Sequence, residues 1–126
     1  MKDITKYQGV IPAFYACYDK DGNISVEGVK ALTRHLISKG VKGVYVGGSS
    51  GECIYQHVDE RKKVLEAVME EAKGKLTVIA HVGCNNTADS VGWLPMPRAL
   101  VLMPSHPSLP FTSTYRNMPS QNIGTL

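Results

Sequence analysis

Three short apolar runs recur along the first part of the chain at a constant interval. They occupy residues 10–14, 43–46 and 76–80, and each begins 33 residues after the one before it. Each run is nearly continuous, which is typical of strands that are buried on both faces of a parallel sheet. The pattern therefore predicts three buried parallel strands.

Two segments with helical periodicity lie between these runs. The first is capped by Ser25 and stops at Gly40, and the second stops at Gly74. Their apolar positions are Val29, Leu32, Leu36 and Ile37 in the first segment and Val64, Leu65, Val68 and Ala72 in the second. The charged run at residues 59–63 is interpreted as the solvated face of the second helix.

The elements thus form a tandem repeat of strand and helix that ends on a third strand. Parallel strands joined by helices form right-handed crossovers, so the predicted fold class is α/β with a parallel sheet. A closed barrel and a doubly wound open sheet both satisfy this pattern.

Composition and charge exclude several classes of function. The formal net charge is +3 and the basic residues are scattered among acids, which argues against a nucleic-acid partner. No run reaches the roughly 18 apolar residues of a membrane-spanning helix, so we expect a cytoplasmic protein with no membrane partner. Cys17, Cys53 and Cys84 are widely spaced, which predicts reduced thiols and no metal site.

The glycine-rich segment at residues 47–52 is the strongest candidate for a binding site. Its sequence, Gly-Gly-Ser-Ser-Gly-Glu, follows the second apolar run and precedes the second helix. Such a turn at the carboxyl end of a strand offers backbone N–H groups to an anion, here together with the hydroxyls of Ser49 and Ser50. The alternative is an ordinary connection between strand and helix. His81 ends the third run and either faces the same edge or is a structural histidine.

Three motifs, taken together, carry a family resemblance. They are Ile-Pro-Ala at residues 11–13, the glycine-rich segment, and Ala-His-Val-Gly-Cys-Asn-Asn-Thr at residues 80–87. Residues 7–91 resemble the N-acetylneuraminate lyase and dihydrodipicolinate synthase family of (β/α)8 barrels. The paired serines and His-Val-Gly resemble the lyase branch, whereas the synthases more typically carry two threonines and Gly-Thr-Gly. The predicted fold is then a partial (β/α)8 TIM barrel, with the first three strands and two helices.

The resemblance implies a class I aldolase that needs no metal or organic cofactor. In the family, a lysine on the sixth strand forms a Schiff base with the keto carbon of pyruvate or of the sugar acid, sialic acid. A tyrosine from the fifth strand relays the proton, and the intact parent is expected to be a homotetramer. The residues that match here are Ser49, Ser50 and Gly48 for the substrate carboxylate, Gly51 and Glu52 as structural residues at the site, and, more loosely, Tyr45 as an auxiliary of the relay.

The composition changes abruptly after residue 91. All 11 acidic residues lie at or before Asp89, and six of the seven prolines lie from Pro95 onward, which favours an irregular, disordered tail.

The permitted codons of this tail, read one base out of frame, encode a string that resembles the next helix and strand of the family. Met103-Pro104 must be ATG CCN, which forces an alanine in that frame. Residues 1–91 are therefore interpreted as the N-terminal part of a TIM-barrel aldolase domain, and residues 92–126 as an out-of-frame tail.

On this interpretation the chain is a truncated lyase, without the Schiff-base lysine and the relay tyrosine. Lys39, Lys42 and Lys75 lie at helix ends or strand starts, away from the carboxyl ends of the strands, so we expect the fragment to be inactive. Two alternatives stay open. One is another pyruvate-dependent aldolase of the same family, and the other is a small non-enzymatic α/β module whose turn binds phosphate or carboxylate.

Overall fold

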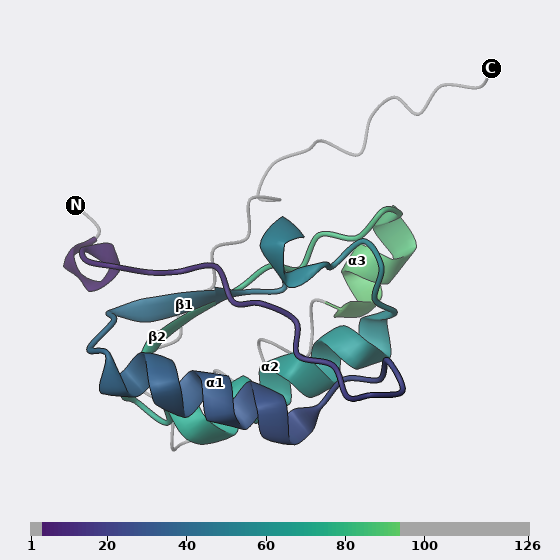
Figure 1. Cartoon of the computed structure of the whole chain (residues 1–126). Helices are drawn as coiled ribbons and strands as arrows, with labels where there is room; N and C mark the ends of the chain where they lie inside the picture. The colour runs from purple at the N-terminus through teal and green to yellow at the C-terminus, as the bar shows by residue number, and fades with distance from the viewer. Residues whose placement is uncertain (1–3, 94–126) are drawn as a thin grey trace.

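A computed structural model describes residues 4–93 of the chain as one α/β unit (Figure 1). The elements, in order, are the 3-10 helix η1 (Thr5–Tyr7), α1 (Val26–Ser38), β1 (Gly43–Val46), the 3-10 helix η2 (Ser49–Gly51), α2 (Val58–Ala72), β2 (Thr77–Ala80) and α3 (Thr87–Trp93). The two longer helices, α1 and α2, lie on the same side of the strands in Figure 1.

The second and third predicted strands are confirmed as β1 and β2. They pair in parallel, with Gly43 opposite Thr77 and Val46 opposite Ala80. The connection between them runs through η2 and α2, which is the crossover expected of neighbouring parallel strands. Val44 and Val78 are buried, at 0% and 1% exposed. Burial on both faces was predicted, but Val78 is the only buried residue of β2, whose other three residues are partly exposed.

The first predicted strand, residues 10–14, differs from the prediction. Within residues 4–93 it pairs with β1 through one parallel bridge, between Ala13 and Tyr45. The Tyr45 N–H donates to the Pro12 carbonyl at 2.9 Å, and the Phe14 N–H donates to the Tyr45 carbonyl at 2.8 Å. Pro12 has no N–H to donate, so a regular ladder cannot extend through it. The segment still runs alongside β1 (Figure 1).

Both long helices end at the predicted glycines, and α1 begins at the predicted cap. The Ser25 hydroxyl accepts a hydrogen bond from the Gly28 N–H at 3.1 Å and so caps α1. At the start of α2 the Glu60 carboxylate accepts from the His57 N–H at 2.8 Å, in a capping box. Gly40 and Gly74 follow the two helices with φ of 71° and 77°, a left-handed conformation that glycine adopts without strain.

The core lies between these helices and the strands. Val29 of α1 and Val68 of α2 are fully buried in one cluster with Val44 and Val78 of the strands. Outside the core, two ion pairs join the helices: Lys30 Nζ lies 2.6 Å from Glu70, and Arg34 Nη1 lies 2.8 Å from Glu71. Such exposed pairs add little stability, so the apolar layer holds the helices together.

Helix α3 was not among the two predicted helices, and it crosses the boundary that composition placed after residue 91. The helix continues to Trp93, whose side chain is 2% exposed and packs in the core. Its indole N–H donates to the His81 carbonyl at 3.1 Å. The first proline of the tail is Pro95, and a helix can run to within two residues of a proline. The rest of the predicted tail, residues 94–126, lies outside the described residues.

The pairing of β1 with β2 requires glycine at position 43. A Cβ there would collide with the Thr77 carbonyl oxygen and lie 2.9 Å from the Thr77 Cβ. We therefore expect Gly43→Ala to lower the free energy of unfolding by about 2 kcal/mol, measured by urea denaturation. Gly92→Ala is the matched control, because a Cβ at Gly92 meets no atom within 4 Å among residues 4–93 apart from its own helix backbone and chain neighbours. Equal midpoints for the two variants would contradict the close approach of the strands.

Candidate carboxylate-binding site

The glycine-rich turn lies at the carboxyl end of β1, where the sequence predicted it. Gly47 adopts a φ of 75°, which turns the chain out of the strand. The next residues form η2, in which the Gly51 N–H donates to the Gly48 carbonyl at 3.0 Å. The Glu52 N–H closes the turn by donating to the Ser49 carbonyl at 2.9 Å. The backbone is thus held by its own hydrogen bonds.

Ser49 and Ser50 are presented to solvent by this turn. Both residues are exposed, whereas the flanking Gly48 and Gly51 are buried. Among residues 4–93, neither serine hydroxyl has a hydrogen-bond partner, and neither serine N–H donates to a carbonyl. Hydroxyl and amide donors that are fixed in place but not used internally can bind an oxyanion. The structure therefore brings Ser49 and Ser50 together, with their hydroxyl and N–H donors unused by the described chain.

Close packing under the turn explains its glycines. A Cβ at Gly48 would lie 2.5 Å from Cε1 of Tyr45, so the tyrosine ring rests against the Gly48 backbone. A Cβ at Gly51 would lie 2.8 Å from the Phe14 carbonyl oxygen. Any larger residue would move the turn away from β1 and from the segment beside it. Tyr45, the predicted auxiliary residue, thus packs directly beneath the turn.

Glu52 contributes through its backbone. It adopts φ 57°, a left-handed conformation that a non-glycine residue rarely takes, and its carbonyl accepts from the Tyr55 N–H at 3.0 Å. Nearby, the Gln56 amide donates to the Gly51 carbonyl and to the Tyr18 hydroxyl, each at 3.0 Å. Burial raises the pKa of the Tyr18 phenol, and the charge of Glu52 raises it further. The Tyr18 hydroxyl oxygen accepts from the Gln56 amide and helps to hold it beside the turn.

His81 has the structural role that sequence reasoning left open. Its Nδ1 lies 3.0 Å from the Gly47 carbonyl oxygen and 3.5 Å from Arg61 Nη2. Because a carbonyl can only accept, the shorter contact is a hydrogen bond in the tautomer that carries the proton on Nδ1. The ring also lies 6.1 Å from the Tyr45 ring, centroid to centroid. His81 follows β2, so this hydrogen bond joins the end of β2 to the turn after β1. The imidazole thereby fixes the position where the turn begins.

Arg61 corrects the interpretation of residues 59–63 as a solvated face. Its side chain is 4% exposed, and Nη2 donates to the His81 carbonyl at 2.8 Å. Nη1 donates to the Gly83 carbonyl at 2.9 Å, and the guanidinium lies 5.4 Å from the centre of the Trp93 ring. Sequence reasoning missed Arg61, although it precedes Val64 by three residues and so lies on the apolar stripe of the helix.

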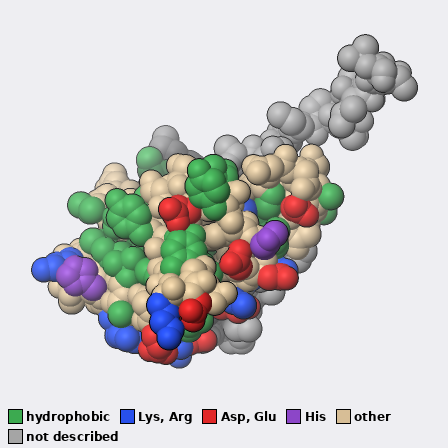
Figure 2. Space-filling view, turned by 45° about the vertical axis from the view of Figure 1, so that its right-hand side comes forward, with side chains coloured by type: hydrophobic (Ala, Val, Ile, Leu, Met, Phe, Trp, Pro, Cys, Tyr) green, Lys and Arg blue, Asp and Glu red, His purple; other side chains and the backbone are tan. Residues whose placement is uncertain are grey.

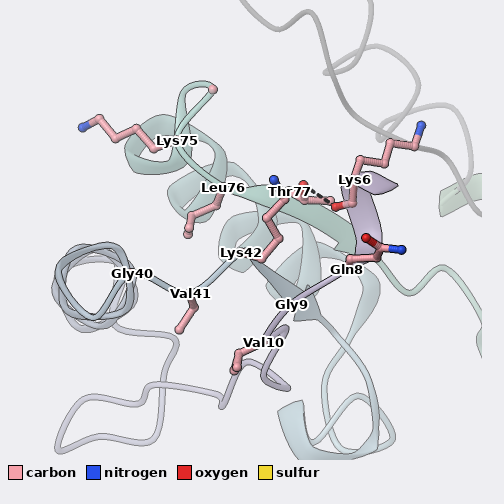
Figure 3. A pocket seen from close by; sticks show the side chains of 11 residues that line it. Lys6, Gln8, Gly9, Val10, Gly40, Val41, Lys42, Lys75, Leu76 and Thr77 are labelled. Atoms are coloured by element: carbon pink, nitrogen blue, oxygen red, sulfur yellow. Dashed lines mark hydrogen bonds between the residues drawn. The ribbon is translucent and has the colours of Figure 1, made fainter. Parts of the chain in front are cut away.

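Three lysines lie at the amino ends of the strands, opposite the end that carries the turn. Lys6, Lys42 and Lys75 line a cavity of about 510 Å³ beside the first residues of β1 and β2. Figure 3 shows Lys6 and Lys75 extending away from each other at the rim of this cavity. The turn with Ser49 and Ser50 follows the last residue of β1, so none of these three lysines lies beside it.

The surface carries further features that bear on partners. Ile54 and Tyr55, in the loop after the turn, are 59% and 78% exposed, and Figure 2 shows hydrophobic side chains gathered on one face. No helix in the described part of the chain is long and apolar enough to cross a membrane. Within the same residues, no cluster of three histidine, cysteine or acidic side chains is arranged to hold a metal ion.

Residues 6–96 match the family model described as Dihydrodipicolinate synthetase family. The chain belongs to this family. The match covers the turn, both strands and the helices, and it ends close to the change in composition after residue 91. The family resemblance carried by the three sequence motifs is therefore confirmed.

Relatives within the dihydrodipicolinate synthetase family include several lyases. The N-acetylneuraminate lyase of Mediterraneibacter gnavus is 72% identical over 90 residues, which cover 71% of this chain and 29% of that protein. N-acetylneuraminate lyase 2 of Escherichia coli O6:H1 is 47% identical over 85 residues and covers 68% of this chain and 28% of that protein. The chain thus spans less than a third of the length of these relatives.

Solved structures of the family confirm the fold. The wild-type sialic acid aldolase of Ruminococcus gnavus superposes with a TM-score of 0.74 and 68% identity, covering 75% of this chain and 32% of that one. N-acetylneuraminate lyase of Mycoplasma synoviae gives 0.74 at 30% identity, covering 78% of this chain and 34% of that one. The fold is the N-terminal part of the TIM-barrel aldolase fold, which resolves the choice left open between barrel and doubly wound sheet.

The buried guanidinium of Arg61 should be essential for this end of the fold. Arg61→Met keeps the apolar stem but leaves the Gly83 carbonyl without its donor and the His81 carbonyl with only the indole N–H. We expect a loss of about 2 kcal/mol in unfolding free energy, measured by urea denaturation. Lys62→Met, which breaks one exposed contact to Asp59 at 3.4 Å, is the control and should change stability by less than about 0.5 kcal/mol. A stabilised Arg61→Met variant would show that the desolvation cost of the charge outweighs its hydrogen bonds.

Proposed function

We propose that this chain is the N-terminal part of an N-acetylneuraminate lyase, and that its glycine-rich turn binds the carboxylate of the substrate. The observation that carries the proposal is the pair Ser49 and Ser50, exposed at the carboxyl end of β1 without internal partners in the described chain. In TIM-barrel enzymes the substrate binds at this end of the strands. The 72% identity to the lyase of Mediterraneibacter gnavus supports the same assignment.

The parent activity is aldol cleavage of N-acetylneuraminate to pyruvate and N-acetylmannosamine, a step of sialic acid catabolism. A lysine amine and the keto carbon form a protonated imine, which accepts the electron pair released when the carbon–carbon bond breaks. The turn contributes binding energy and orientation by holding the adjacent carboxylate. Tyr45, packed under Gly48, would keep the turn in place. The intact parent is proposed to be a cytoplasmic homotetramer that needs no cofactor.

The 126 residues by themselves are proposed to bind but not to cleave. Imine formation needs an amine within bonding reach of the keto carbon. Lys6, Lys42 and Lys75 line a cavity at the amino ends of the strands, and the turn lies beyond their carboxyl ends. Residues 92–126 are proposed to be translated out of frame, which the coding DNA tests directly. One inserted or deleted base near codon 91 that restores a lyase-like frame would support this, and an unbroken frame would refute it.

Pyruvate should bind weakly at the turn. We expect titration of the 126-residue chain with millimolar pyruvate to shift the amide resonances of residues 47–52 in NMR spectra, most strongly those of Ser49 and Ser50, whose N–H groups donate to no carbonyl in the described chain. Replacing both Ser49 and Ser50 by alanine should abolish the shifts. Ser38→Ala is the matched control, since its exposed hydroxyl donates to the His35 carbonyl at the end of α1. Shifts centred on Lys42 and Lys75 would place the anion site at the amino ends of the strands and contradict the proposal.

Pyruvate should form no imine with this chain. Incubation with pyruvate and borohydride should leave the mass of the 126-residue chain unchanged, because Lys6, Lys42 and Lys75 lie in the cavity at the amino ends of the strands and the turn follows the carboxyl end of β1. The same gene with its frame restored should gain one reduced pyruvate adduct, on a lysine beyond residue 126, as mass spectrometry would show. A single adduct on Lys42 or Lys75 of the short chain would overturn the assignment of the chemistry to the missing strands.

A further inference from the structure

A second cavity, separate from the serine pair, brings two thiols and a buried guanidinium together. It has a volume of about 510 Å³ and lies between the loop that enters α2 and the loop that follows β2. Cys53, Cys84 and Arg61 line it, together with Asn86 and Asp89, and neither Ser49 nor Ser50 does. Both thiols are half-buried, so small molecules can reach them through the cavity.

The guanidinium of Arg61 contacts one of these thiols directly. Nη1 lies 3.1 Å from Cys84 Sγ and donates to it. The sulfur's other contact is weak, a distance of 3.8 Å to the Val82 carbonyl. The Ser90 hydroxyl accepts from the Cys84 N–H at 2.9 Å, which fixes the backbone that carries the thiol. Cys84 is therefore held with its sulfur against a positive charge.

No carboxylate within residues 4–93 neutralises that charge. Arg61 donates to the His81 and Gly83 carbonyls and to the Cys84 sulfur, Nη2 also lies 3.5 Å from His81 Nδ1, and its Nε is buried without a partner. Two acidic side chains line the same cavity, but Asp59 contacts Lys62 Nζ at 3.4 Å and Asp89 accepts from the Asn86 amide instead. A buried, unpaired charge is costly, and negative charge on a neighbouring atom relieves that cost.

We propose that Cys84 is a modification site, a thiol that Arg61 activates toward hydrogen peroxide and similar small electrophiles. As the thiol proton leaves for solvent, negative charge develops on sulfur beside the guanidinium, and the anionic sulfur is the nucleophile. With peroxide, the sulfur attacks one oxygen, an S–O bond forms and the O–O bond breaks. The departing hydroxide takes up a proton to give water, so the sulfur is oxidised to sulfenic acid and the peroxide is reduced.

Modification of Cys84 acts on the same network that supports the turn. An added oxygen on Sγ enlarges the group that Nη1 contacts, and the guanidinium also holds the His81 and Gly83 carbonyls. His81 in turn donates to the Gly47 carbonyl, where the glycine-rich turn begins. Oxidation of Cys84 therefore weakens the contacts from Arg61 and His81 that hold the turn in position. The inference does not rest on the proposed lyase function, because it concerns the thiol's own reactivity.

The other two cysteines are internal references. Cys53 lines the same cavity, but no guanidinium contact to it occurs in the described chain. Cys17 lies away from the cavity, against Gly28 of α1, and burial raises the pKa of its thiol. A thiol that is merely half-buried reacts more slowly in the folded chain than in the unfolded chain. An activated thiol reverses that order.

The reactivity of all three thiols can be measured in the reduced 126-residue chain. The chain is alkylated with iodoacetamide, in buffer and in urea, and the rate at each cysteine is read by peptide mass spectrometry. We expect Cys84 to react about tenfold faster than Cys53 in buffer, and faster in buffer than in urea. Low concentrations of hydrogen peroxide should then give a sulfenic acid at Cys84 first. Rates at Cys84 that are equal to those at Cys53, or lower in buffer than in urea, would overturn the proposal.

Two variants of Arg61 test whether its positive charge causes the fast reaction of Cys84. Arg61→Met should lower the Cys84 rate about tenfold, whereas Arg61→Lys should keep part of it, because the ammonium retains the positive charge. The Cys17 rate reports folding in each variant and should not change. If the Met variant unfolds and the Cys17 rate rises, the comparison of buffer with urea in the parent chain decides the proposal. A Cys84 rate that stays unchanged in a folded Arg61→Met variant would refute the role of Arg61.

Discussion

The buried guanidinium of Arg61 is the contact on which this end of the molecule depends. It reaches from α2 across the carboxyl end of β2, where it donates to the His81 and Gly83 carbonyls. Loop carbonyls at strand ends have no sheet partner, so a multidentate donor such as arginine can satisfy several at once. Trp93 of α3 adds a second donor to the His81 carbonyl and packs near the guanidinium. One side chain thereby joins α2, β2 and α3.

The order that Arg61 imposes reaches the candidate site through His81. With its carbonyl held by Arg61, the His81 imidazole is positioned to donate to Gly47, the first residue of the turn. The ring of Tyr45 and the close approach at Gly48 fill the space beneath the serines. The donors of Ser49 and Ser50 are thus arranged before any ligand arrives, which lowers the entropic cost of binding an anion. The turn's own hydrogen bonds set its shape, and the contacts from Arg61, His81 and Tyr45 fix its position on β1.

Most of the fold could be predicted from the sequence because it depends on local and periodic signals. The 33-residue spacing gave β1 and β2, and Ser25, Gly40 and Gly74 marked the ends of the long helices. The prediction of a regular first strand was wrong because it followed the apolar run and gave no weight to Pro12, which has no N–H to donate to a ladder. The burial of Arg61 and Trp93 was not predicted for a different reason. Their burial depends on carbonyls that only the tertiary fold brings within reach, and a charged residue in a charged run gives no local sign of this.

In the proposed parent, binding of the carboxylate and cleavage of the carbon–carbon bond are assigned to different strands of the barrel. A TIM barrel closes with eight strands, and inward-facing groups from opposite strands meet at its carboxyl face. Within residues 4–93, β1 pairs with β2 on one side and with residues 10–14 on the other. A side chain on a neighbouring strand can hold the carboxylate, but an amine that attacks the adjacent keto carbon must approach across the mouth of the barrel. In the proposed parent, the turn after β1 therefore sets where the substrate lies, and the strands beyond this segment determine what happens to it.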